Sequence, residues 1–370
     1  MTDRLEFSHV EALHVLGEPV AGPPPLVQAV QARGAVLEWQ VGGPCFPTLT
    51  ITDPAECDWL WRLIGERGHA AVIAHAAGPA KLAEGAAAVA VDVEWDGELL
   101  ADLRRMAHGH WLRAWWPASP IDGVAALDGV LLHAELALSA ADLDDVLADG
   151  ADAVDGPELA GLRAHAEGLR QRAGSLDPEV REVAHAALEL MEEPAPERSG
   201  MWRDDYALVA GGRRDADDDA IAAGTASHEW RGVPAGTLDS SESAVSWTLD
   251  AAETVELTVR AALVGGADAT GIAVHATVGA VDVAGRLDAD GVAVLTVDMD
   301  AADAWALDAN DVDVRVGAVD PAGDGAETPD VRDRVRDFAA TRLELARGTA
   351  EAAESGAAFV VEKLAARLSR

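Results

Sequence analysis

The sequence predicts a multi-domain α+β protein with an antiparallel β-sandwich in its second half. Three patterns predict this fold class. Strand and helix patterns alternate near the N-terminus, apolar residues recur every three to four positions in the middle, and they recur every second position beyond residue 244. A chain of 370 residues is expected to form two or three domains. The predicted regions are a mixed α/β region over 1–120, a helical region packed on it over 121–192, a linker over 193–202, the β-sandwich over 203–320 and C-terminal helices over 326–370.

The N-terminal region begins with a strand pattern at Ala35–Val41. The run Asp53–Glu56 predicts a helix start, because aspartate caps helices, proline suits the first helical position and glutamate follows three residues after the cap. We expect this helix to bury its apolar face and to end at Gly68. The next predicted elements are strands at Ala71–Ala74 and Val89–Trp95 and a helix at Asp96–Ala107.

Helical spacing dominates the middle of the chain. Apolar residues recur at intervals of three and four within Leu127–Leu138 and within Leu159–Ala173. A further helix begins at Asp177-Pro178-Glu179 and continues to Met191. The run 192–200 contains two prolines and no apolar period, so it predicts a linker.

Beyond the linker the apolar period changes to two. Short strands of this kind, each with one polar face, are typical of an antiparallel sandwich. Asp290-Gly291 predicts a tight turn between two of them. No cysteine pair supports a true immunoglobulin domain, so "Ig-like" describes the architecture alone. The predicted strands lie at 245–249, 255–263, 272–278, 286–289, 292–297 and 312–316.

Two helices are predicted near the C-terminus. Thr328-Pro329-Asp330 opens the first, and Gly348 ends it. The second lies within Ala357–Leu368 and carries an apolar stripe, whose exposure would forgo roughly 1.5–3 kcal/mol per large side chain. We expect the stripe to dock on the first helix as an antiparallel hairpin; the alternative is a partner or a second copy of the chain. The stripe consists of Val360, Val361, Leu364 and Leu368.

The chain is strongly acidic. Lys and Arg number 28 against 65 Asp and Glu, a formal net charge of -37. This charge repels phosphate backbones and anionic lipids, and Arg332, Arg334 and Arg336 alternate with acidic residues. We therefore predict no binding to nucleic acid. No apolar run reaches the roughly 18–20 residues of a membrane span, and no signal peptide is recognised, so we predict a cytoplasmic protein without membrane association. A GC-rich genome and adaptation to salt remain alternative explanations for the acidity.

The histidines provide weak candidates for metal ligands. His108 and His110 would chelate a metal together if the backbone between them were extended, but no further ligand set accompanies them. The similar His-Ala-Glu triplets that begin at His133 and His165 lie on predicted helices, where residues two apart face different sides. We therefore predict a structural role for these histidines, with no metal and no cofactor.

Acidic runs and cysteines are the remaining reactive groups. The runs 213–219 and 288–291 match no calcium-binding loop and are expected to be solvated turns. Cys45 and Cys57 are too few for a disulfide framework and are expected to be free thiols. No base for a nucleophilic Cys45 can be identified.

Grouped tryptophans are the most unusual local feature. Trp111, Trp115 and Trp116 would form either an interaction hot spot or the packing beneath a domain junction. A sandwich that binds a carbohydrate or another small molecule would need a row of surface aromatic residues. The candidates for such a row are Trp230, Trp247 and Trp305.

Two segments carry a resemblance. Residues 111–138 and 203–212 resemble segments of uncharacterised proteins from high-GC Gram-positive bacteria. The resemblance implies a bacterial cytoplasmic protein and brings no activity, fold or site residues with it.

The leading functional hypothesis is a non-catalytic interaction or adaptor protein, for which a protein partner is the expected ligand. It depends on the absence of GxSxG, Walker and GxGxxG motifs. One alternative is an enzyme, such as a hydrolase, with a site dispersed over the N-terminal half. The other is a sandwich that binds a small molecule or a carbohydrate.

Overall fold

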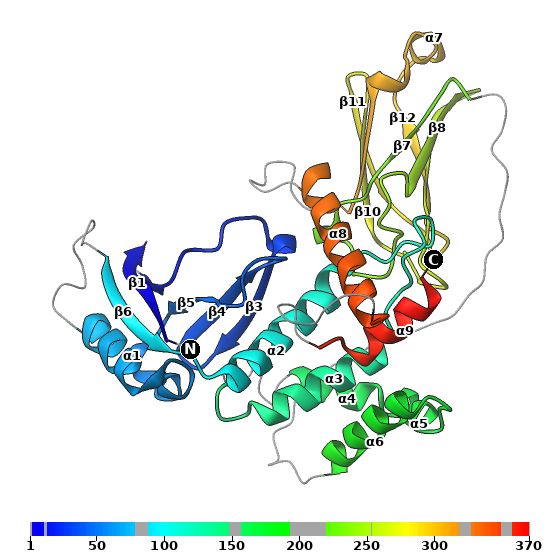
Figure 1. The fold of residues 1–370 in the computed structure, drawn as a ribbon. Helices are drawn as coiled ribbons and strands as arrows, with labels where there is room; N and C mark the ends of the chain where they lie inside the picture. Colours follow the sequence, from blue (N-terminus) through cyan, green and yellow to red (C-terminus); the bar gives the residue numbers. More distant parts are fainter. Residues whose placement is uncertain are drawn as a thin grey trace. The chain divides into compact units, whose positions relative to one another are not determined.

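The computed structural model (Figure 1) describes residues 2–10, 13–77, 88–147, 157–192, 220–252, 254–317, 327–348 and 357–369. Its helices and its antiparallel sheets confirm the α+β class. The described residues fall into two compact units. Unit 1 draws on Met1–Arg113, Asp128–Arg198 and Asp337–Ala366, and unit 2 on Ala114–Leu127, Ser199–Arg336 and Arg367–Arg370. The predicted linker over 193–202 lies outside the described residues.

Unit 1 contains a six-stranded antiparallel sheet in the order β3-β4-β5-β2-β1-β6. Alternate residues of the inner strands are buried, as in Ala35, Leu37 and Trp39 of β4, which explains the period of two in the predicted strand. The strands are β1 (Thr2–Val10), β2 (Leu13–Leu16), β3 (Val27–Ala32), β4 (Ala35–Gln40), β5 (Thr48–Ile51) and β6 (Val89–Glu94).

The first helix differs from its prediction. Asp53 does cap Pro54–Glu56, but these residues form a short 3-10 turn, and α1 spans Leu60–Ala77, beside the sheet in Figure 1. The predicted end at Gly68 and the predicted strand Ala71–Ala74 are therefore wrong. The break lies at Gly65, whose φ of 77° and ψ of 157° are not helical. Gly68 instead allows close packing, since a Cβ there would lie 3.3 Å from the carbonyl oxygen of Asp92 in β6.

Four of the other helices of unit 1 pack around buried alanine and leucine side chains. A cluster formed by α3, α4, α5 and α6 includes Ala134, Leu162, Leu169 and Ala184, all with 0% exposure. This packing explains the three-four spacing of the sequence. The helices are α2 (Gly97–Trp115), α3 (Gly129–Asp142), α4 (Pro157–Ala164), α5 (Ala166–Ala173) and α6 (Pro178–Glu192).

Unit 2 contains two antiparallel sheets, β12-β9-β8-β7 and β11-β10-β13. Inward residues of both sheets, such as Leu257 of β9 and Val274 of β10, belong to one hydrophobic cluster. The strands are β7 (Ala222–Ala226), β8 (Val245–Ala251), β9 (Val255–Ala261), β10 (Ala273–Val278), β11 (Val281–Arg286), β12 (Val292–Val297) and β13 (Val312–Val316); the short helix α7 spans Ala301–Ala304.

The strand predicted at 286–289 is wrong. β11 ends at Arg286, and the following residues form the turn to β12. Asp288 Oδ1 accepts the main-chain N–H groups of Asp290 and Val292, at 3.0 and 2.8 Å, so the turn is closed by the aspartate. The tight turn at Asp290-Gly291 is confirmed.

The last two described helices are α8 (Pro329–Ala346) and α9 (Val360–Leu368). Within unit 1, Arg342 contacts Glu362 and Arg347 donates to the carbonyl oxygen of Ala366. These contacts join the end of α8 to α9, and the antiparallel direction of the pair stays a prediction. Buried charged groups fix this arrangement, and the amphipathic pattern of α9 did not reveal them.

Candidate functional site

The candidate site is a pocket in unit 2 that we call the tryptophan pocket. Its lining includes Trp115, Trp116, His228, Trp230 and Ser240. Its empty volume is about 290 Å³, a figure that includes space open to solvent. The pocket is therefore small, and part of its space is open surface.

One wall of the pocket begins where α2 ends. Pro117 disfavours helical geometry at the residue before it, so the chain leaves the helix after Trp115. The wall is then tied to the segment 238–240. Ser240 Oγ donates to the carbonyl oxygen of Ala118 at 2.8 Å, and Ser119 Oγ donates to Asp239 Oδ1 at 2.7 Å. Two segments about 120 positions apart in sequence therefore form one structure.

Two buried side chains of the lining have polar atoms without a partner among the described residues. They are His228, through Nδ1, and Trp230, through Nε1. Both residues are buried: His228 is 5% exposed and Trp230 is 7% exposed. Trp116 differs, because its Nε1 donates to the carbonyl oxygen of Ala125 at 2.9 Å. Unpaired buried polar atoms cost about 1–3 kcal/mol each and are uncommon in folded proteins.

His228 is held in its neutral form. Burial lowers the pKa of His228 to about 4, and the positive charges of Arg332 and Arg336 act in the same direction. A hydrogen bond to the main chain of Asp239 raises the pKa, as expected where a ring N–H donates to a carbonyl oxygen. The unpartnered Nδ1 is then an acceptor.

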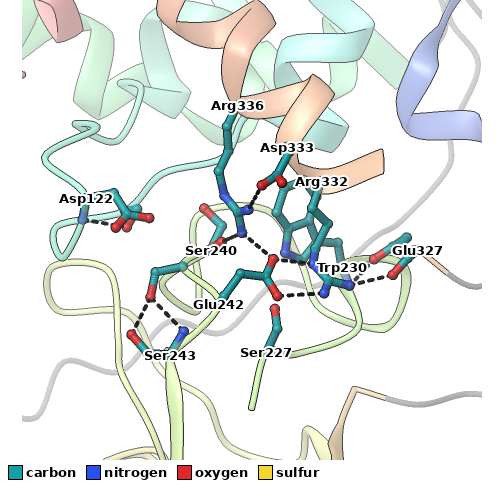
Figure 2. A network of polar contacts seen from close by, with 12 residues as sticks. Asp122, Ser227, Trp230, Ser240, Glu242, Ser243, Glu327, Arg332, Asp333 and Arg336 are labelled. Carbon is teal, nitrogen blue, oxygen red and sulfur yellow. Dashed lines mark hydrogen bonds and ion pairs between the residues drawn. The ribbon is translucent and has the colours of Figure 1, made fainter. Parts of the chain in front are cut away.

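A group of charged residues lies beside Trp230 (Figure 2). Arg332 binds Glu242 through two hydrogen bonds of 2.6 and 2.7 Å, and Arg336 donates to the same carboxylate at 2.9 Å. The guanidinium carbon of Arg336 lies 5.5 Å from the centre of the Trp230 ring system. Interactions with the two arginines lower the pKa of Glu242, so this carboxylate stays charged.

The main chain at Trp230 is fixed by a buried carboxylate. Glu327 accepts the main-chain N–H of Trp230 at 2.7 Å and that of Arg231 at 2.9 Å (Figure 2). Burial raises the pKa of Glu327, and these two hydrogen bonds oppose that rise. The indole is therefore positioned from its backbone as well as from its ring.

The pocket region contains the residue types of a hydrolase, but their hydrogen bonds follow another pattern. Ser240 donates its hydroxyl proton to Ala118, and Asp239 accepts from Ser119 and from the main-chain N–H groups of Ile121 and Ser241. A nucleophile needs a base that accepts its proton and a third group that orients the base. Among the described residues, these hydrogen bonds do not form such an arrangement around Ser240.

The predicted pair His108 and His110 lies within α2, so its backbone is helical, and the extended chelating geometry is excluded. His108 is buried in unit 1, where Nε2 lies 3.1 Å from Glu362 Oε1 and Nδ1 lies 2.9 Å from Gln28 Nε2. Gly109 allows this packing, since a Cβ there would lie 2.5 Å from the Leu136 side chain.

The structure brings together the histidines of the two similar triplets. The rings of His133 and His165 are 4.8 Å apart between centroids. Glu135 does not join them, because it accepts main-chain N–H groups from Val360 and Val361. Among the described residues no group of three or more His, Cys, Asp or Glu could hold a metal ion, and the acidic run 213–219 lies outside them.

The tryptophans of the sequence cluster separate. Trp111 is buried in unit 1, where its Nε1 donates to the carbonyl oxygen of Pro25 at 2.8 Å, whereas Trp115 and Trp116 line the pocket. A surface row of Trp230, Trp247 and Trp305 does not form. Trp247 is in the core of unit 2, Trp230 is buried, and only Trp305 is exposed.

The structure also shows where the two cysteines and the apolar stripe of α9 lie. Cys45 and Cys57 are free, as predicted, and burial raises the pKa of Cys57 to about 12. In the stripe of α9, Val361 is buried, Val360 and Leu364 are half-buried and Leu368 is 74% exposed.

No helix of the described residues has the length and apolar character needed to cross a bilayer.

Comparison with family models, curated proteins and solved structures found no match to this chain.

Sequence reasoning missed His228 and Ser240. Neither belongs to a motif, and the available signal was only their proximity to Trp230 in the chain. Their meeting with Trp115 and Trp116 depends on hydrogen bonds between distant segments, which no local pattern encodes.

Proposed function

We propose that this protein is a non-catalytic binding protein and that the tryptophan pocket is its ligand site. The observation that carries the proposal is the pair of unpartnered buried atoms, His228 Nδ1 and Trp230 Nε1, in side chains that line the pocket. Binding sites commonly combine apolar walls with a few polar groups that fix orientation. In the same proposal, unit 2 is an Ig-like sandwich, the protein is cytoplasmic, and the ligand is a small molecule or one side chain of a protein partner.

A pocket-filling variant tests the site. Ala235 lines the pocket and is exposed, so Ala235→Trp should close the space without disturbing the core. Ala289→Trp is the matched control, because Ala289 is also exposed and lies in the turn before β12. The probes are phenol, indole, benzoate and benzylamine, and the readout is the Trp230 indole N–H resonance, assigned as the peak missing from Trp230→Phe.

We expect at least one probe to shift this resonance in the wild type and in the control variant Ala289→Trp. The same probe should not shift it in Ala235→Trp. If no probe shifts it in the wild type, or if Ala235→Trp responds like the wild type, the pocket is not a ligand site.

The absence of catalysis is tested separately. The probe substrate is p-nitrophenyl acetate, and the variant is Ser240→Ala, which removes the one serine that lines the pocket among the described residues. We expect the wild type and the variant to hydrolyse the ester at the same rate. A rate that depends on Ser240 would replace the proposed binding function with a hydrolase.

A further inference from the structure

The two similar triplets that begin at His133 and His165 bring a pair of imidazole rings together in unit 1. His133 lies in α3, and His165 is the N-cap residue of α5. Their ring centroids are 4.8 Å apart, and the ring planes are inclined by 52°. Both residues are half-buried, which leaves the pair open to ions from solvent. The fold thus offers two adjacent imidazole groups to a single ion.

The ring of His133 is held in one orientation. Its Nδ1 lies 2.8 Å from the carbonyl oxygen of Gly129, one turn earlier in α3. Because a carbonyl oxygen only accepts, Nδ1 carries the proton, and Nε2 of the uncharged ring keeps its lone pair. Histidine ligands of metals commonly make such a hydrogen bond through the second ring nitrogen, since it fixes both the tautomer and the ring.

The Nε2 edge of His133 lies against α4. A Cβ at Gly161 would lie 3.0 Å from Cδ2 of His133 and 3.5 Å from Nε2, so the glycine leaves room for the ring. Gly161 lies one turn before His165, and the main-chain N–H of His165 donates to the Gly161 carbonyl oxygen at 3.3 Å. Residues four apart lie on the same side of a helix, so this edge of His133 faces the side of α4 from which His165 follows.

The spacing of the two rings fits one metal ion. Imidazole nitrogens bind transition metals at about 2.0–2.1 Å, which places each ring centre about 3.2 Å from the metal. With the centroids 4.8 Å apart, two such bonds would meet at roughly 100°. This angle lies between the right angle of a square-planar site and the tetrahedral angle, and copper, nickel and zinc ions adopt these geometries with imidazole ligands.

The protein offers this ion nitrogen ligands rather than oxygen ligands. The neighbouring carboxylates are in ion pairs, Asp128 with Arg172 and Glu167 with Arg170. Among the described residues no group of three or more His, Cys, Asp or Glu could hold a metal ion, so water would complete the coordination. A site of this kind disfavours Mg²⁺ and Ca²⁺, which prefer oxygen ligands.

We infer that His133 and His165 form a two-histidine site for a divalent transition-metal ion, which binds copper(II) more tightly than nickel(II). The inference does not depend on the tryptophan pocket, which is a separate site in unit 2, so the two proposals succeed or fail separately.

The test measures metal binding to the full chain. Nickel(II) is titrated by isothermal calorimetry in excess Mg²⁺, which occupies general acidic sites on a chain with a net charge of -37. His133→Gln and His165→Gln each remove one ligand. Loss of even an outer-shell partner commonly costs 10–100-fold in metal affinity, so each variant should bind nickel(II) at least about tenfold more weakly. The double variant should bind no more weakly than either single variant, because the loss of one ligand already ends chelation.

Two control variants remove other histidines. His185→Gln removes an exposed histidine of α6. His9→Gln removes one member of a second pair, since the ring centroids of His9 and His14 are 5.0 Å apart across β1 and β2. Both controls should bind nickel(II) as tightly as the wild type.

A spectroscopic measurement keeps the test decisive if His133→Gln or His165→Gln does not fold. With one equivalent of copper(II), the electron paramagnetic resonance spectra of the wild type and of His9→Gln should both show two nitrogen ligands. A single nitrogen ligand, or oxygen ligands alone, would overturn the inference.

Loss of nickel(II) affinity confined to His133→Gln and His165→Gln supports the site. Unchanged affinity in either of these variants, loss of affinity in His9→Gln, or displacement of nickel(II) by Mg²⁺ shows that the two histidines do not form it.

Discussion

His108 and Glu362 are hydrogen-bonded in the interior of unit 1: Nε2 of His108 lies 3.1 Å from Oε1 of Glu362, although 254 positions separate them in the chain. Arg342 binds the same carboxylate through Nε at 2.8 Å and Nη2 at 2.7 Å. Burial alone would raise the pKa of Glu362, but the interactions with His108 and Arg342 outweigh it and lower the pKa to about 2. Burial lowers the pKa of His108, so the ion pair at neutral pH is that of Arg342 with Glu362.

Glu362→Gln should destabilise the protein strongly, because it leaves the buried guanidinium of Arg342 without a counter-charge. We expect a loss of about 3–5 kcal/mol in the free energy of unfolding, measured by urea denaturation. The control is Glu179→Gln, which breaks the partly exposed ion pair with Lys363 and should cost less than about 1 kcal/mol. If the two variants lose equal amounts of unfolding free energy, the buried pair of Arg342 and Glu362 is no more important for stability than the partly exposed one.

His228 should make stability depend on pH. Its pKa is about 4 in the folded protein and ordinarily 6.5, so between these limits the unfolded chain binds a proton that the folded protein does not. Stability from this group is present above pH 6.5 and is lost as the pH falls towards 4, by roughly 3 kcal/mol in total.

His228→Gln should therefore flatten the decline in unfolding free energy across this window, measured by urea denaturation at several pH values. His275→Gln is the matched control, because His275 is an exposed histidine in β10. If His228→Gln declines as steeply as the wild type, His228 is not buried in its neutral form.

The C-terminal helix should respond unequally to truncation of its apolar side chains. Val361 is 0% exposed, so Val361→Ala should cost about 2 kcal/mol in unfolding free energy. Leu368 is 74% exposed, and Leu368→Ala should change it by less than about 0.5 kcal/mol. A larger effect at Leu368, or an effect that changes the oligomeric state in size-exclusion chromatography, would place the stripe in an interface.

The close approach of Gly232 to Gly317 supports the segment after Trp230. A Cβ at Gly232 would lie 1.5 Å from the carbonyl oxygen of Gly317, so Gly232→Ala should destabilise unit 2 by at least about 2 kcal/mol. Gly266→Ala is the control, because nothing lies within 4 Å of a Cβ there. Thermal unfolding of both variants checks the prediction, and similar melting temperatures would refute it.

The net charge of -37 should make stability depend on salt. Screening weakens repulsion among the carboxylates, so the melting temperature should rise as NaCl is added, with most of the gain below roughly 0.3 M. A further rise at molar salt would indicate adaptation to salt, and a flat response would show that repulsion is unimportant.

The sequence determined the local elements whose periodicity reports burial of one face. Strands β8, β9, β10 and β13 follow the predicted alternation, and α6 follows its predicted helical stripe. These patterns arise because a strand or helix with one buried face repeats apolar residues at its own period. They were sufficient for the α+β class.

Only the tertiary structure showed which close contacts individual glycines allow and which groups form hydrogen bonds with the buried polar residues. Gly68 resembled a helix end in the sequence but serves close packing against β6, because the space at a glycine depends on its spatial neighbours. His108 resembled half of a metal site but pairs with Glu362, and His228 had no signal until the chain placed it beside Trp230 in the pocket lining. Contacts across long sequence separations leave no local period, so the fold itself determines which polar groups meet and which remain available to a ligand.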